Sequence, residues 1–261
     1  MINGWLTTII DFVFPHHEVL RNGEKAFWDN HWSRMIQYYK NHGEIFEIND
    51  KWDFCCNAAL HNHYKSMIKN FRKLSCIECG CGGGYESTLL IKEGGKITIL
   101  DYSEKALEYA KIVRQRMGGS NTIEFIQEDI LSFVPTRKYD LAWNCGVIEH
   151  YQDNEIIKII EKMTSFVKRG GLVVITVPNL LSPQSIYWTL KEGKGSERYL
   201  SHRKLKVLMT KAGLKNIQIK NLHYWLPSFL PYTWAIKISE FKILNNIKYL
   251  TWLFSGIGIK S

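Results

Sequence analysis

The sequence predicts an α/β fold in which a mostly parallel β-sheet carries helices on both faces. Three observations lead to this prediction. Short apolar runs rich in Ile, Val and Leu recur along the chain, a glycine cluster at 80–84 follows the first of them, and Asp101 ends the second. In open α/β sheets, a strand that passes through glycines into a helix forms a ligand site at the carboxyl edge of the sheet. We expect that site to hold a nucleotide-like cofactor.

Length and composition indicate one α/β core with additions. The chain has 261 residues, of which 45% are hydrophobic and 13% aromatic, enough to bury one full core. We expect residues 1–74 to form an N-terminal helical cap and residues 75–261 to form the cofactor-binding domain. Residues 179–200 then form an insertion within that domain.

The first strand, expected at 75–79, ends in a turn that requires glycine. A strand that turns at once into a helix needs residues that tolerate positive φ, and a cofactor lying against the turn leaves no room for Cβ atoms. Gly80, Gly82 and Gly84 meet both demands. After a helix from residue 85 and a second strand at 96–100, Asp101 stands where an acidic side chain accepts hydrogen bonds from a ribose diol.

The spacing of these residues discriminates between classes of glycine loop. A phosphate-binding loop requires Lys and Ser or Thr after its last glycine, whereas Tyr85 and Glu86 follow Gly84 here. A dinucleotide fingerprint is disfavoured because Tyr85 occupies the place of a third small residue. The remaining pattern, Glu78-x-Gly-x-Gly-x-Gly followed by Asp101, resembles the first motif of class I S-adenosylmethionine-dependent methyltransferases. An acid at position 78 suits a cofactor that carries an ammonium group and no pyrophosphate.

The resemblance continues in register along the chain. Residues 122–130 are similar to the family's third strand and the acidic corner after it, residues 139–150 to its fourth strand with a Glu-His ending, and residues 170–178 to its fifth strand. The resemblance implies a Rossmann-like class I methyltransferase fold of the small-molecule, type 11/12-like branch. It also implies S-adenosylmethionine as the cofactor and S-adenosylhomocysteine as the product. The residues it assigns to the cofactor are Glu78, Cys79, Gly80, Gly82, Gly84, Asp101, Tyr102, Asp129, Ile130, Asn144 and Cys145.

The segments outside these motifs are expected to complete the sheet and form the acceptor site. A helix from about residue 201, a helix at 233–248 and a last strand at 253–260 would complete a seven-stranded sheet. Apolar and aromatic residues at helical intervals in 27–39 predict a cap that either packs on the sheet edge or closes over the cofactor. The insertion at 179–200 reads as a loop with a short helix at 186–188 that shapes the acceptor site.

His150 is the candidate general base, with Glu149 beside it. Methyl transfer from a sulfonium requires alignment and exclusion of water, and a hydroxyl acceptor also requires a base. The other interpretation is structural, with the Glu-His pair shaping the turn. No metal is expected: similar quinone O-methyltransferases carry a further acid where this chain has Gly146, and Cys76, Cys79 and Cys81 lack a second ligand pair.

Charge indicates the nature of the acceptor. Residues 158–261 contain 17 Lys and Arg against 4 Glu and no Asp, which suits an anionic small molecule or an anionic lipid headgroup, or simply a solvated surface. Nucleic acid is disfavoured because Asn144-Cys145-Gly146-Val147 replaces the Asn/Asp-Pro-Pro-aromatic turn of base-amine methyltransferases. Two other functions stay open: an NAD(P)-dependent oxidoreductase, and an S-adenosylmethionine-binding protein without catalysis.

The six cysteines indicate a reducing, cytoplasmic location, because a disulfide at Cys79, Cys81 or Cys145 would distort the glycine turn. The apolar segment 5–14 lacks a basic leader and contains Asp11, so we expect a docking segment rather than a signal peptide. Peripheral membrane contact is the alternative for this segment. Oligomeric state is not indicated by any pattern in the sequence.

Overall fold

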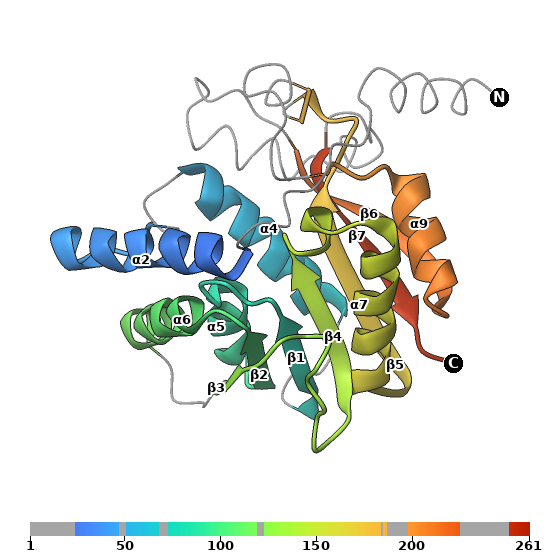
Figure 1. Cartoon of the computed structure of the whole chain (residues 1–261), viewed down its shortest axis with the longest axis horizontal. Coiled ribbons are helices and arrows are strands. Elements are labelled where there is room, and N and C mark those ends of the chain that lie inside the picture. The colour runs from blue at the N-terminus through green and yellow to red at the C-terminus, as the bar shows by residue number, and fades with distance from the viewer. Residues whose placement is uncertain are drawn as a thin grey trace.

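The computed structural model describes residues 24–46, 51–67, 73–118, 123–183, 185–186, 198–224 and 251–261. Within them, a seven-stranded sheet has the strand order β3-β2-β1-β4-β5-β7-β6 (Figure 1). Its strands are β1 (Ser75–Cys79), β2 (Lys96–Asp101), β3 (Ile123–Gln127), β4 (Tyr139–Cys145), β5 (Val167–Pro178), β6 (Lys215–Tyr224) and β7 (Thr251–Ile259).

The sheet is mostly parallel, as predicted. The strands β1 to β5 pair in parallel, and β7 runs antiparallel to both β5 and β6. The predicted last strand is confirmed as β7, and β5 begins at Val167, ahead of the two glycines that were expected to introduce it. The predicted helix at 233–248 and the apolar segment 5–14 lie outside the described residues.

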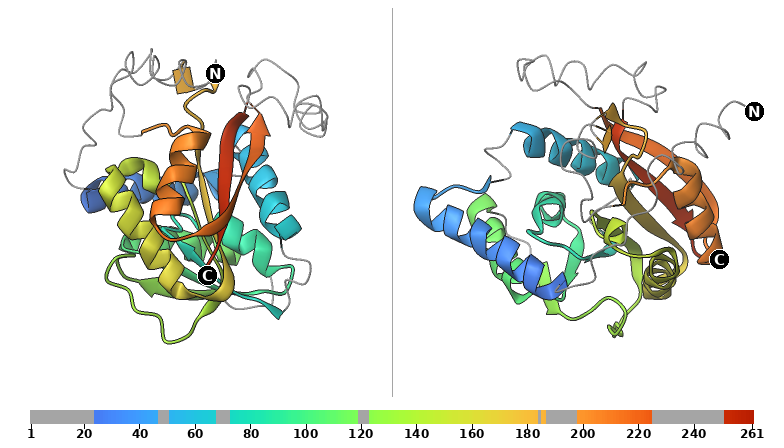
Figure 2. Two further views of the ribbon diagram at one scale, coloured as in Figure 1. Left: turned by 90° about the vertical axis from the view of Figure 1, so that its right-hand side faces the viewer. Right: turned by 45° about the horizontal axis from the view of Figure 1, so that its top comes forward.

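Helices cover both faces of the sheet (Figure 2). The helices α4 (Lys51–Met67), α5 (Tyr85–Ile91) and α6 (Glu104–Met117) pack on one face. The helices α7 (Asp153–Phe166) and α9 (His202–Lys211) pack on the other. Each face is closed by an apolar cluster, so the strands between them are buried on both sides, as the apolar runs in the sequence require.

The helix α2 (Glu24–His42) lies within the predicted cap and packs on α6 rather than on the sheet (Figure 1). Ile36 of α2 joins Tyr109 and Val113 of α6 in a small apolar cluster, and Trp32 stacks on Tyr109 with ring centroids 5.7 Å apart. Residues 27–39, expected as a cap, therefore belong to a helix that packs on α6 through Trp32 and Ile36.

The glycine loop after β1 has the conformation that the sequence predicts. Gly80, Gly82 and Gly84 have φ angles of 70°, 50° and 60°, in the left-handed region that side chains with a Cβ rarely adopt. The backbone N–H groups of Gly80 and Cys81 donate to the carbonyl of Leu100 on β2, at 2.7 and 3.2 Å. These two hydrogen bonds fix the loop at the carboxyl edge of the sheet.

The insertion at 179–200 begins and ends beside the sheet. Asn179 and Leu200 form a parallel bridge, and the Leu200 N–H donates to the Pro178 carbonyl at 3.4 Å. Residues 184 and 187–197, which include most of the predicted short helix, lie outside the described part. The described helices include none that is both long and apolar enough to cross a bilayer.

Candidate functional site

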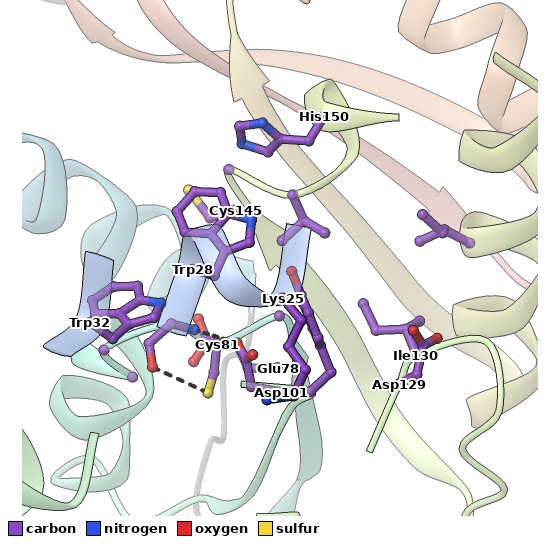
Figure 3. Close-up of a pocket in the computed structure, with 18 of the residues that line it drawn as sticks. Lys25, Trp28, Trp32, Glu78, Cys81, Asp101, Asp129, Ile130, Cys145 and His150 are labelled. Atoms are coloured by element: carbon purple, nitrogen blue, oxygen red, sulfur yellow. Dashed lines mark hydrogen bonds between the residues drawn. The ribbon is translucent and has the colours of Figure 1, made fainter. Parts of the chain in front are cut away.

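A cavity of about 660 Å³ opens at the carboxyl edge of the sheet, where β1, β2 and β4 end. Figure 3 shows its residues arranged between the helix α2, the glycine loop and the loop after β3. Its size lies within the roughly 300–1,000 Å³ that is usual for small-molecule sites. The residues that line it are Lys25, Trp28, Trp32, Glu78, Gly80, Cys81, Gly82, Gly83, Gly84, Tyr85, Glu86, Asp101, Tyr102, Asp129, Ile130, Leu131, Cys145, Gly146, Val147, His150, Tyr151, Glu155 and Ile159.

Asp101 is held by the backbone on both of its carboxylate oxygens. Oδ2 accepts from the N–H of Gly82 and Oδ1 from the N–H of Ser103, each at 2.9 Å. Burial raises the pKa of Asp101 to about 6, although these two hydrogen bonds lower it. Each carboxylate oxygen has a second lone pair, so the group can still accept from two hydroxyls in the cavity.

Glu78 lies at the end of β1 and is buried in the wall of the cavity. The hydroxyl of Ser87 donates to its Oε2 at 2.5 Å. Burial and the negative charge of Glu86 raise the pKa of Glu78 to about 8, whereas the Ser87 hydrogen bond lowers it. This carboxylate is therefore an electrostatically unfavourable group that a cationic ligand would stabilise.

The acidic corner after β3 forms another end of the cavity, with Asp129 and Ile130 (Figure 3). The Asp129 carboxylate accepts from the N–H of Leu131 at 2.6 Å, and the Asp129 carbonyl accepts from the N–H of Phe133 at 2.9 Å. These bonds form a tight turn that presents Asp129 and the side chain of Ile130 to the cavity. Tyr102, after β2, also lines the cavity.

The helix α2 lies across the cavity and contacts two of its loops. The ring of Trp28 meets that of His150 edge to face, with centroids 5.1 Å apart. Trp32 lies over Gly82 so closely that a Cβ on this glycine would be 2.5 Å from the ring. Figure 3 shows both tryptophans on the same stretch of α2, with His150 next to Trp28.

Most residues that the sequence assigns to the site line this one cavity. They are Glu78, Gly80, Gly82, Gly84, Asp101, Tyr102, Asp129, Ile130, Cys145 and His150. Three others lie behind the wall. Cys79 is buried in the apolar cluster on the α7 face, the Asn144 amide is directed to the Met163 sulfur at 3.5 Å, and Glu149 is buried with its carbonyl bound by the Arg198 N–H.

Several lining residues were not assigned to the site from the sequence, among them Lys25, Trp28, Trp32 and Glu86. The spacing of Trp28 and Trp32, four residues apart, places both on one helix face and was a signal that they act together. Glu86 stands two residues after Gly84, and its position in the first turn of a helix was the available signal.

Comparison with known proteins agrees with this geometry. The family described as "Methyltransferase domain" matches residues 70–227, more than half of the chain. The ubiquinone biosynthesis O-methyltransferase of Rickettsia canadensis is 23% identical over 199 residues, which cover 72% of this chain and 77% of that protein. A malonyl-[acyl-carrier protein] O-methyltransferase of Ilyobacter polytropus is 28% identical over 126 residues, 46% of this chain and 45% of that protein.

Solved structures show the same fold at low sequence identity. The magnesium protoporphyrin IX methyltransferase of Synechocystis, with bound S-adenosylhomocysteine, has a TM-score of 0.67 and 13% identity, and the match covers 91% of this chain and 98% of that one. A SAM-dependent methyltransferase of Archaeoglobus fulgidus has a TM-score of 0.56 and 16% identity, covering 78% and 94%. The family match decides against the oxidoreductase alternative. This chain belongs to the class I S-adenosylmethionine-dependent methyltransferase family, and S-adenosylmethionine is its cofactor.

Proposed function

We propose that this methyltransferase acts on an oxygen atom of a small aromatic or apolar acceptor. One observation carries the proposal: the acids that end β1 and β2 and the corner after β3 share one cavity with His150, which lies on the opposite side beside Trp28. The cavity thus has acidic side chains that can bind a cationic nucleoside at one end, and the imidazole of His150, which can act as a base, at the other.

Three acids suit three parts of the cofactor. We assign Glu78 to the ammonium group, because a buried carboxylate with a raised pKa is stabilised most by a cation. Asp101 is assigned to the ribose hydroxyls, since its carboxylate lines the cavity and is held in place by two backbone N–H groups. Asp129 is assigned to the amino group of adenine, and Ile130 to the face of the ring.

The catalytic requirements of the protein are modest. S-adenosylmethionine supplies a methyl group on a positively charged sulfur, which is already activated for transfer. The protein must therefore hold the acceptor oxygen in line and keep water out. For a hydroxyl acceptor, His150 takes up the proton, and Glu149 supports the turn that carries it.

The predicted cap, residues 1–74, contributes the helix α2 to this site. Lys25, Trp28 and Trp32 of α2 line the cavity, so this helix shields the glycine loop from solvent and forms one side of the acceptor pocket. The rings of Trp28 and Tyr151 favour a flat or apolar acceptor. Among the lining residues Lys25 is the one Lys or Arg, and its ammonium is paired with Asp29 of the same helix at 2.6 Å.

The names of two relatives support an oxygen acceptor, since both are O-methyltransferases. The excess of Lys and Arg in 158–261 supports presentation of the acceptor from an anionic lipid surface, which co-sedimentation with anionic and neutral vesicles can test. A cytoplasmic location is part of the proposal: Cys76, Cys79, Cys81 and Cys145 are free thiols, as a reducing compartment requires.

The test is formation of S-adenosylhomocysteine from S-adenosylmethionine with two sets of acceptors. The first set is hydroxylated aromatic acids with and without an isoprenoid tail, and the second is acyl carboxylates. We expect turnover with the hydroxyl set and a loss of about 100-fold or more in His150→Gln, with cofactor affinity unchanged. His42→Gln, an exposed histidine of α2, is the matched control.

The same assay separates the other functions. Turnover with the hydroxyl set that His150→Gln does not reduce would contradict the assignment of His150 as a base. Turnover with carboxylates alone would contradict the hydroxyl acceptor, because a carboxylate needs no base. Cofactor binding without turnover on either set would support the binding protein without catalysis.

A further inference from the structure

Glu86 places a second carboxylate at the Glu78 end of the cavity. It stands in the first turn of α5, next to Ser87, and its half-buried side chain lines the cavity. Glu86 lies outside the acid-and-glycine pattern that identifies the family, so the resemblance assigns it no role. Its charge is the largest electrostatic contribution that raises the pKa of Glu78.

We propose that Glu78 and Glu86 together bind the ammonium group of the cofactor, and that the pair gives up a proton when the ammonium binds. This inference rests on the proposed function, because it requires the cofactor's amino-acid end to lie in this part of the cavity. Its new content is the role of Glu86 and the exchange of a proton for a cation.

The groups that face the pair are acidic or neutral. Asp101 on β2 adds a second negative charge that raises the pKa of Glu78. Burial and the charge of Glu78 raise the pKa values of Tyr64 on α4 and of the Cys79 and Cys81 thiols. These groups therefore stay uncharged and supply no cation. Lys25 lines the same cavity, but its ammonium is bound to Asp29 of its own helix at 2.6 Å.

The negative charge of Glu86 disfavours ionisation of the buried Glu78 carboxyl. The Ser87 hydroxyl, which donates to Glu78 at 2.5 Å, favours the charged form of that acid. Burial and Glu86 outweigh it and raise the pKa of Glu78 to about 8. The raised pKa of Glu78 therefore favours its protonated form at neutral pH, and a bound ammonium group replaces that proton.

A metal ion is a weaker explanation for the pair. The described residues contain no group of three His, Cys, Asp or Glu side chains with the arrangement of a metal site. Two carboxylates supply the acceptors that an ammonium group requires, since it donates three hydrogen bonds and carries one positive charge.

The experiment compares two ligands that differ only at this end. S-adenosylhomocysteine carries the amino-acid end, and 5′-methylthioadenosine lacks it. Calorimetric titration at pH 6, 7 and 8, in buffers of different ionisation enthalpy, counts the protons released. For the wild type we expect S-adenosylhomocysteine to release close to one proton at pH 7 and to gain affinity up to tenfold per pH unit as pH rises. Between pH 7 and 8, methylthioadenosine should show neither effect.

The variant Glu86→Gln isolates the second carboxylate. We expect affinity for S-adenosylhomocysteine to fall about tenfold or more and its proton release to fall toward zero, with methylthioadenosine affinity unchanged. Glu86→Asp should restore part of the affinity and of the proton release. Glu161→Gln, an exposed acid of α7 outside the cavity, should match the wild type.

Two results would overturn the inference while leaving the cofactor site intact. One is wild-type affinity and proton release for S-adenosylhomocysteine in Glu86→Gln. The other is an equal loss of both ligands in that variant, which would show that the effect is not specific to the amino-acid end. If the wild type bound neither ligand, the proposed cofactor site itself would be wrong.

Discussion

Asp29 of the helix α2 accepts a hydrogen bond from the hydroxyl of Ser103 at 2.5 Å, which ties the cap to the loop after β2. The backbone N–H of the same Ser103 donates to Asp101, and Asp101 accepts from the N–H of Gly82. Burial raises the pKa of Asp29, but the hydrogen bonds from Lys25 and Ser103 outweigh it and hold the pKa below its usual value. The position of α2 is thus linked, through Ser103, to the carboxylate assigned to ribose.

Replacing Asp29 by Ala should loosen α2 and weaken cofactor binding. The change removes the acceptor of the Ser103 hydroxyl, a charge-assisted bond worth about 1–2 kcal/mol, so we expect affinity for S-adenosylhomocysteine to fall about three- to tenfold. Hydrogen exchange should become faster in 24–42 and remain unchanged in α7. Asn30→Ala, at an exposed position of the same helix, is the control. Unchanged exchange in α2 would show that this bond does not hold the helix.

Replacing Gly82 by Ala should displace Trp32. The new Cβ would lie 2.5 Å from the indole ring, at a backbone φ of +50° that already disfavours alanine. We expect a loss of about 2 kcal/mol in the free energy of unfolding. In the background of Trp32→Leu the same substitution should cost at least about 1 kcal/mol less, because the clash is gone and the φ strain remains. If Gly82→Ala lowered the free energy of unfolding by the same amount with and without Trp32→Leu, as measured by chemical denaturation, close packing of Trp32 on this loop would be contradicted.

Replacing Glu78 by Gln should stabilise the ligand-free protein at high pH. The folded-state pKa of about 8 lies above the ordinary value of 4.5, so the folded chain keeps a proton that the unfolded chain has lost. The contribution of Glu78 to the free energy of unfolding therefore falls as pH rises from about 4.5 to 8. The free energy of unfolding of the variant should exceed that of the wild type by about 1 kcal/mol or more at pH 8. At pH 4.5 the difference should be small, because the glutamine side chain can still accept the hydrogen bond from Ser87.

Thermal unfolding of both proteins across this pH range measures the difference, with Glu161→Gln as control. The same variant should lose S-adenosylhomocysteine affinity, since it lacks the buried charge. A wild-type pH profile in Glu78→Gln would mean that Glu78 is ionised in the folded protein.

Replacing Asp101 by Ala should reduce affinity for both S-adenosylhomocysteine and methylthioadenosine by about tenfold or more, because both carry the ribose. This behaviour differs from that expected of Glu86→Gln, which should affect only the first ligand. Since burial raises the pKa of Asp101 to about 6, wild-type affinity for methylthioadenosine should also fall below that pH, as the carboxylate takes up a proton. Unchanged affinity in a folded variant would contradict the ribose assignment.

Replacing Arg198 by Met should loosen the turn that carries His150. The buried guanidinium of Arg198 donates to the Tyr151 carbonyl at 2.7 Å and to the Asp153 carboxylate at 2.8 Å. The backbone N–H of Arg198 donates to the Glu149 carbonyl at 2.9 Å. Chemical denaturation should show a loss of about 2 kcal/mol in the free energy of unfolding. The reason is that the Tyr151 carbonyl loses its donor and the Asp153 carboxylate loses one of its two cationic partners. Arg203→Met, an exposed position on α9, should change stability by less than about 0.5 kcal/mol.

The glycine loop could be predicted from the sequence because its cause is local. Three glycines at alternate positions specify a left-handed turn, and Gly80, Gly82 and Gly84 all adopt it. The strand β6 was not assigned, since its residues 215–224 include many polar side chains at the edge of the sheet and lack a clear apolar pattern. The helices α6 and α7 were likewise not assigned, because no motif in the sequence identifies them.

The sequence by itself determined the fold class, the cofactor family and the acids at the ends of β1 and β2. These features depend on residue type and spacing along the chain, which a βα unit converts directly into positions at one sheet edge. Only the tertiary structure decided which side chains share the cavity. It brought Trp28 of α2 against His150, more than a hundred residues later, and buried Asn144 and Glu149 behind the wall. Packing between distant segments decides such contacts, and no local pattern encodes it.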